Sequence, residues 1–159
     1  MGLNNIETKP FENFSKEWAL VTAGSKDGYN TMTIGWGAMG TLWSTPVVIV
    51  FVKPVRYTSE FLKDNEYFTV SFYDEEYRKD LAILGSKSGK DGDKVAETRL
   101  HPKFLENTVT FEEAKTTYVL KKIYTSQFVK ENVPEFAKEK YYLDEEEHYI
   151  FVGEVKEVL

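Results

Sequence analysis

The stretch GYNTMTIGWGAMGTLWSTPVVIVFVKPVRYT, from Gly28 to Thr58, decides how we interpret this chain. It contains a turn, a segment rich in small, hydroxyl and aromatic residues, and an apolar run from Val47 to Val52. It ends with the cation Arg56 beside Tyr57 and Thr58. We interpret it as two strands followed by an anion-binding turn that opens a helix. This mixture of residues suits a flat, anionic, partly aromatic ligand.

Composition excludes several classes of protein. The chain has 159 residues, enough for one domain that buries roughly two-thirds of its unfolded surface. The net charge of −6 argues against a nucleic-acid partner, because phosphate backbones require basic patches. There is no cysteine, so disulfides and thiolate catalysis are excluded. The two histidines, His101 and His148, are too few for a multi-histidine centre, so we expect no metal site.

The chain shows no sign of export or of membrane insertion. No basic segment followed by an apolar core stands at its N-terminus, so we predict no signal peptide. The longest apolar run, Val47 to Val52, is too short to span a membrane. We therefore expect a soluble, cytoplasmic protein made of a single domain over residues 1–159. Residues 1–10 are polar and form an N-terminal arm in this interpretation.

Periodicity and turn residues predict many strands separated by a few short helices. The aromatic content of 15% also favours strands. We predict helices at 11–18, 59–63, 77–84 and 134–140, and strands at 19–23, 31–37, 47–52, 67–72, 116–128 (bent or bulged) and 149–158. Residues 24–30 form a hairpin turn, and residues 40–46 and 86–93 form loops. This order predicts a mainly β fold, a closed or nearly closed antiparallel barrel.

One end of the opening stretch resembles a phosphate site. If Thr58 is the N-cap of the helix that follows, an anion there would meet free amides, a hydroxyl and the guanidinium of Arg56. An ordinary cap beside a surface arginine would show the same pattern, so both interpretations stay open.

The other end could hold an aromatic ring. Asn30, Thr31, Met32 and Thr33 offer amide and hydroxyl groups beside Trp36. A flavin ring needs polar groups at its pyrimidine edge and apolar contact elsewhere, which Trp36, Trp43 or Met39 could provide. The same residues could also be the core and turn of a hairpin.

Taken in order, these residues resemble the flavin reductase-like family, the FMN-binding split barrel of the flavoredoxin type. The set is Asn30 to Thr33, Trp36, Gly37, Trp43, Pro46 and Arg56 to Thr58. Three later pieces match in the same order: Tyr67 to Ser71, the Ser-Gly…Asp-Lys loop from Ser88 to Lys94, and the strand from His148 to Val155. The resemblance covers the chain from about Phe14 to Val158.

The resemblance implies an antiparallel, Greek-key type split β-barrel that forms a homodimer and binds FMN non-covalently near the dimer interface. By analogy, the residues Asn30, Thr31, Met32 and Thr33 lie along the flavin ring and ribityl chain. Arg56 and Thr58 hold the phosphate, and the loop from Ser86 to Lys94 closes over the phosphate or the ribityl side. Trp36, Tyr57, Ser88 and Lys94 complete the set of cofactor-binding residues. His148 becomes a candidate catalytic residue that orients a nicotinamide or shuttles a proton; the alternative is a histidine at the start of a strand.

Two functions of different class follow from the resemblance. One is an NAD(P)H-dependent flavin or FMN reductase, which passes hydride to flavin and electrons onward to free flavin, a metal complex or a redox protein. The other is a non-enzymatic FMN protein, either an electron carrier with a protein donor or a flavin-binding module. A third interpretation is a barrel that binds no flavin. The chain departs from the family at Glu147-His148, where Asp is common before the histidine, and at Val70-Ser71, where Val-Asn is common. It also lacks a GxGxxG fingerprint, so NAD(P)H would dock only transiently.

Overall fold

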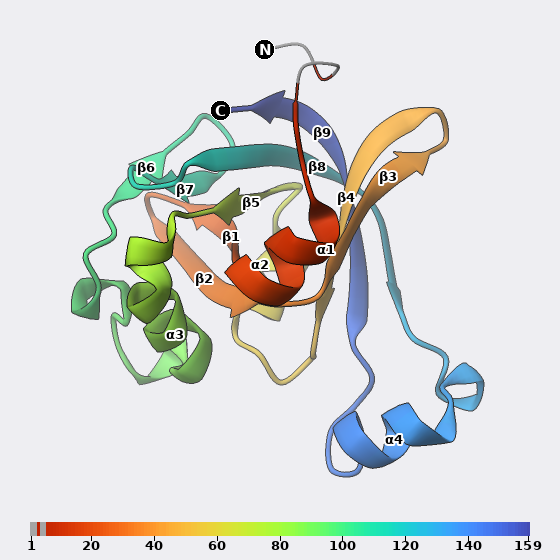
Figure 1. Cartoon of the computed structure of the whole chain (residues 1–159). Coiled ribbons are helices and arrows are strands. Elements are labelled where there is room, and N and C mark those ends of the chain that lie inside the picture. Colours follow the sequence, from red (N-terminus) through yellow and green to blue (C-terminus); the bar gives the residue numbers. More distant parts are fainter. Residues whose placement is uncertain (1–2, 4–5) are drawn as a thin grey trace.

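A single antiparallel sheet dominates the computed structural model, which describes Leu3 and residues 6–159 (Figure 1). Its seven strands lie in the order β2-β1-β5-β8-β9-β4-β3, and every neighbouring pair is antiparallel. The strands are β1 (Ala19–Ser25), β2 (Gly28–Ile34), β3 (Gly37–Leu42), β4 (Thr45–Val52), β5 (Tyr67–Phe72), β8 (Thr116–Gln127) and β9 (Tyr149–Val158). The sheet curls but does not close, since β2 and β3 are its two edges.

Short elements fill the connections. The helices are α1 (Pro10–Glu12), η2 (Asn13–Glu17), α2 (Thr58–Asp64), η3 (Glu75–Tyr77), α3 (Arg78–Ser86), η4 (Gly89–Asp91), η5 (Val95–Glu97), η6 (Lys130–Asn132) and α4 (Glu135–Tyr141). A small hairpin pairs β6 (Pro102–Phe104) with β7 (Val109–Phe111). The β8–α4–β9 connection projects away from the sheet (Figure 1), and no residue of α4 is buried.

The main core lies inside the curled sheet. Val21, Val50, Phe68 and Phe151 are each at most 1% exposed there. Phe14 reaches this core from the N-terminal helix, and its ring lies so close to Gly37 that a Cβ at Gly37 would meet it at 2.4 Å. Glycine is therefore needed at the start of β3 for Phe14 to pack.

Most of the predicted elements are confirmed. The bent strand at 116–128 is β8, whose pairing with β9 shifts register at two places, as a bulged strand requires. The hairpin turn is shorter than predicted, because β1 runs to Ser25 and β2 begins at Gly28.

Two predictions about local structure are wrong. Residues 40–46 are not a loop: β3 and β4 pair through them, and Trp43 and Ser44 form the turn with φ of 52° and 58°. Such left-handed turns usually contain Gly or Asn, and neither residue stands at positions 43 and 44. The segment at 11–18 is not one amphipathic helix either, because it passes from α1 into the π-helix η2 and leaves Phe11 92% exposed.

The arm predicted at residues 1–10 is only partly described. Residues 1–2 and 4–5 lie outside the described residues, and residues 6–9 have no regular structure. Ile6 packs against the main core.

Candidate functional site

A cavity of about 260 Å³ lies where the turn before α2 meets the C-terminal end of α3. It is lined by Asn30, Val55, Arg56, Tyr57, Thr58, Gly85, Ser86, Lys87, Ser88 and Lys94. Arg56 donates from Nη2 to the carbonyl of Gly85 at 3.1 Å. Lys94 donates from Nζ to the carbonyls of Leu84 at 2.9 Å and Lys87 at 3.0 Å. We call this space the cation cavity, since two cationic side chains converge on it.

The two cations of this cavity have no carboxylate partner. Among the described residues, no carboxylate lies within 4.0 Å of the charged nitrogens of Arg56 or Lys94. Burial lowers the pKa of Arg56. Burial, and then the charge of Arg56, lowers the pKa of Lys94 to about 8. The α3 carbonyls offset part of this positive charge, and a bound anion would offset the rest.

Asn30 and Thr58 form the floor of the cation cavity. Asn30 donates from Nδ2 to the hydroxyl oxygen of Thr58 at 2.8 Å, and both side chains are buried. The expectation that Thr58 is the N-cap of α2 is wrong. Tyr57 holds the cap position and no side chain caps it. Thr58 is already helical, and its hydroxyl accepts the hydrogen bond from Asn30.

A second cavity, of about 380 Å³, adjoins the first and shares Val55 and Arg56 with it. Its walls combine apolar side chains with polar and charged ones. They are formed by Met32, Thr33, Ile34, Gly35, Trp36, Phe51, Lys53, Val55, Arg56, Glu145 and His148. Trp36 remains 46% exposed at this site. We call this space the ring cavity, because its apolar side chains can contact the face of an aromatic ring system while its polar groups can bond to the edge.

His148 closes one side of the ring cavity in a neutral state. Burial, and then the charge of Lys53, lowers its pKa to about 4, although Glu145 opposes the shift. Its Nδ1 lies 2.6 Å from the hydroxyl of Tyr142, and its ring lies 5.2 Å from that of Trp36. At neutral pH the imidazole is therefore uncharged, which favours hydrogen bonding over proton shuttling.

The projecting connection is tied to the ring cavity through Lys53. Its Nζ pairs with Glu145 at 2.6 Å and donates to the carbonyl of Tyr141 at 2.8 Å. The ring of Tyr141 in turn meets Trp36 edge-on at 4.9 Å. The position of His148 thus depends on contacts with residues 141–145.

The structure brings most of the predicted site residues to these two cavities. Asn30, Arg56, Tyr57, Thr58, Ser88 and Lys94 line the cation cavity, and Met32, Thr33, Trp36, Arg56 and His148 line the ring cavity. Thr31 lines neither, because its hydroxyl turns into the sheet toward Thr22 and the carbonyl of Val21. Of the two other ring candidates, Trp43 is 66% exposed and packs on Tyr124, and Met39 packs against the core.

Sequence reasoning missed the contribution of α3 and of the projecting connection. The end of α3 supplies the carbonyls of Leu84, Gly85 and Lys87 that hold the two cations. The predicted helix stop at Gly85, directly before the Ser-Gly loop, was the available signal. For Lys53, Tyr142 and Glu145 no local pattern marked a role.

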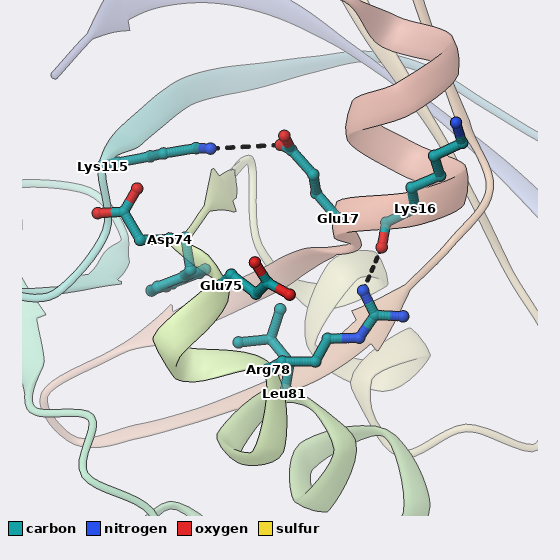
Figure 2. Close-up of a pocket in the computed structure, with 8 residues that line it drawn as sticks. Lys16, Glu17, Asp74, Glu75, Arg78, Leu81 and Lys115 are labelled. Carbon is teal, nitrogen blue, oxygen red and sulfur yellow. Dashed lines mark hydrogen bonds and ion pairs between the residues drawn. The ribbon is translucent and has the colours of Figure 1, made fainter.

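A third charged pocket lies away from these cavities, between η2, the segment that follows β5, and α3 (Figure 2). We call it the paired pocket, and it is lined by Lys16, Glu17, Tyr73, Asp74, Glu75, Arg78, Leu81 and Lys115. Lys115 pairs with Glu17 at 3.3 Å. Arg78 donates to the carbonyl of Lys16 and lies 3.4 Å from the centre of the Trp18 ring. These contacts join the N-terminal helix to α3.

Neither a metal-binding cluster nor a membrane-spanning helix is found in the described part of the chain. No cluster of three or more His, Cys, Asp or Glu side chains there could hold a metal ion. None of the helices described is long and apolar enough to cross a membrane.

Comparison with known proteins gives the family. The model of the flavin reductase like domain matches residues 11–159, so the chain belongs to that family. No curated protein matches the chain.

Solved structures agree on the fold. A flavoredoxin from Methanosarcina acetivorans superposes with a TM-score of 0.70 at 22% identity, over 90% of this chain and 67% of that one. An FMN-binding protein from Thermus thermophilus gives 0.72 at 20% identity, over 100% and 79%. The styrene monooxygenase flavin reductase from Pseudomonas putida S12 gives 0.66 at 18% identity, over 90% and 78%. These likenesses confirm the predicted split-barrel fold.

Proposed function

We propose that this chain binds FMN non-covalently, with its phosphate in the cation cavity and its ring in the ring cavity. The observation that carries the proposal is the pair of cations, half-buried Arg56 and buried Lys94, which have no carboxylate within 4.0 Å among the described residues. Their cavity adjoins a second one that contains Trp36 and Phe51. A phosphate would supply the missing charge through charge-assisted hydrogen bonds. The similarity to an FMN-binding protein and to a flavoredoxin supports this assignment.

Individual residues then have distinct tasks. Arg56, which lines both cavities, would hold the phosphate from the ring side. Lys94 would hold it from the loop side, and Ser88 would lie over it. Met32 and Thr33 would lie along the ring, and Trp36 would provide an exposed aromatic surface at its edge.

We further propose that the protein is an NAD(P)H-dependent flavin or FMN reductase. Bound FMN supplies the hydride and electron chemistry, and the chain binds the flavin, orients it and leaves one side of the ring cavity open. Neutral His148, held by Tyr142, would offer a hydrogen bond to the nicotinamide amide rather than a proton. The flavin reductase among the similar structures supports this proposal.

A second candidate is an FMN electron carrier that takes electrons from a redox protein. The observation that favours it is the exposed apolar surface of the projecting connection, where Phe136 is 72% and Leu143 is 77% exposed. This connection also carries Glu145 and His148 of the ring cavity, so a protein docked there would lie close to the flavin. The similarity to a flavoredoxin agrees with this alternative.

Absorbance and turnover separate these possibilities. We expect the purified protein to retain added FMN after removal of the excess, with flavin bands near ~375 and ~450 nm. A reductase oxidises NADH or NADPH steadily when free FMN is added. A carrier keeps its FMN but leaves both nucleotides unoxidised until a redox partner is supplied. A protein that retains no FMN contradicts both candidates.

A homodimer and a cytoplasmic location are part of the reductase proposal. The exposed residues Phe136 and Leu143 would be covered in such a dimer, whereas in the carrier alternative they would face the redox protein. Sedimentation velocity at micromolar concentration tests the oligomeric state, and a monomer would contradict it.

A further inference from the structure

A further cavity, which we call the outer cavity, adjoins the cation cavity and shares no lining residue with the ring cavity. It has a volume of about 400 Å³ and shares Asn30, Tyr57 and Lys94 with the cation cavity. Its remaining walls include Tyr29, Phe61 and Asp93. The cation cavity thus shares lining residues with both the ring cavity and the outer cavity. A ligand larger than FMN could therefore extend from the cation cavity into the outer cavity.

The boundary between the cation cavity and the outer cavity is a direct contact made by Gly89. A Cβ placed on Gly89 would lie 2.1 Å from Oδ1 of Asn30 and 3.1 Å from Cδ2 of Tyr57. Both partners belong to the set of residues that the two cavities share. The backbone of the loop therefore lies against Asn30 and Tyr57 at the dividing line, and only glycine allows this approach.

Further contacts on both sides hold the loop in this position. On the α3 side, Nζ of Lys94 is bound to the carbonyls of Leu84 and Lys87. On the α2 side, Nζ of Lys90 lies 5.3 Å from the centre of the Tyr57 ring and 3.7 Å from a carboxylate oxygen of Glu60. Within the loop, Ser88 accepts a hydrogen bond from the backbone of Lys90.

The two common flavin nucleotides differ at the point where this boundary lies. FMN ends in a phosphate monoester, whereas FAD continues from its first phosphate into a second phosphate and adenosine. If the first phosphate is held by Arg56 and Lys94, the rest of FAD must pass the Gly89 contact to enter the outer cavity.

We propose that the contact of Gly89 with Asn30 and Tyr57 separates the cation cavity from the outer cavity and thereby makes the site selective for FMN over FAD. This inference rests on the proposed function, because it assumes that the flavin phosphate occupies the cation cavity. Selectivity then comes from a steric and desolvation cost imposed on the longer ligand rather than from an additional contact with FMN.

The test is a fluorescence titration of the protein with FMN and with FAD, which gives a dissociation constant for each flavin. We expect the wild-type protein to bind FMN at least about tenfold tighter than FAD. In Gly89→Ala the methyl group collides with Asn30 and pushes the loop away, so this ratio falls by about fivefold or more. Asn30→Ala opens the same boundary from the other side and lowers the ratio in the same direction.

Gly40→Ala is the matched control, since nothing lies within 4 Å of the added Cβ there; its ratio stays at the wild-type value. Circular dichroism verifies that each variant is folded, and Asn30→Ala decides the matter if Gly89→Ala does not fold. Equal wild-type affinity for the two flavins, or an unchanged ratio in a folded Asn30→Ala or Gly89→Ala protein, overturns the inference alone. A wild-type protein that binds neither flavin overturns the proposed function as well.

Discussion

The cation cavity and the paired pocket contain similar cationic side chains, but the partners of these side chains differ. In the paired pocket, Lys115 pairs with the carboxylate of Glu17 (Figure 2), and Arg78 lies on the indole ring of Trp18. In the cation cavity, the side-chain hydrogen bonds of Arg56 and Lys94 within the described part of the chain go to carbonyls at the end of α3. Charges withdrawn from solvent are normally paired, and we therefore propose that an anion completes the cation cavity. On this proposal, the partners of the charges, rather than their number, distinguish a binding site from a structural contact.

The most direct test of this difference is to remove one arginine from each pocket and to measure the affinity for FMN. Arg56→Ala should weaken FMN binding by about 1.5–3 kcal/mol, the usual range for a hydrogen bond to a charged group. Riboflavin, which has no phosphate, should bind with unchanged affinity. Fluorescence titration with the two flavins measures both effects.

Arg78→Ala is the control for that experiment, since it removes a guanidinium from the paired pocket instead. It should leave the affinity for FMN unchanged and lower only the stability of the fold, which thermal unfolding measures. An Arg56→Ala protein with wild-type affinity for FMN would remove the distinction between the pockets.

A smaller effect is expected from Lys94, whose pKa is lowered to about 8 by burial and by Arg56. Lys94→Met should weaken FMN binding by about tenfold. In the wild-type protein, FMN affinity should fall as the pH rises above about 8, since Lys94 then loses its proton. This decline should be absent from the variant.

The stability of the flavin-free protein should change with pH in the opposite direction. Lys94 binds its proton less strongly when folded than when unfolded, where its pKa is near 10.5. Between about pH 8 and 10.5 the unfolded chain therefore holds more protons than the folded chain. The contribution of Lys94 to the free energy of unfolding rises with pH over this range. Chemical denaturation of the wild type and of Lys94→Met across this range tests the sign; identical slopes would contradict it.

The smallest effect is predicted for the paired pocket. Glu17 has a lowered pKa, first through its hydrogen bond from Asn13 and then through Lys115, but its side chain is 38% exposed. Glu17→Gln should therefore cost no more than about 1 kcal/mol of stability, as for other exposed ion pairs. It should not change FMN affinity, and a measurable loss of affinity would show that this pocket belongs to the binding site.

Much of the fold could be predicted from local pattern. Val47 to Val52 and Tyr149 to Val158 are strands because β-branched and alternating residues fit a pleated surface. The hairpin at Trp43-Ser44 could not be predicted, because its residues adopt positive φ without the usual glycine or asparagine. The π-helix η2 could not be predicted from local pattern either, because Phe14 of this helix packs on Gly37, which is distant in the sequence.

The candidate site divides in the same way. Arg56 and Asn30 could be identified because they lie in one ordered stretch of sequence. The carbonyls of Leu84, Gly85 and Lys87 could not, since any residue offers a carbonyl and only the folded chain brings them to the two cations. The orientation of Thr31 into the sheet likewise depends on which face of β2 is buried.

One measurement tests the central claim most directly: equilibrium dialysis of the wild-type protein against FMN and, separately, against riboflavin. The two ligands share the ring and the ribityl chain and differ only in the phosphate. If Arg56 and Lys94 await an anion, FMN binds at least about tenfold tighter than riboflavin. Equal affinity for the two ligands, or no binding of FMN, would contradict the claim that the unpaired cations form a phosphate site.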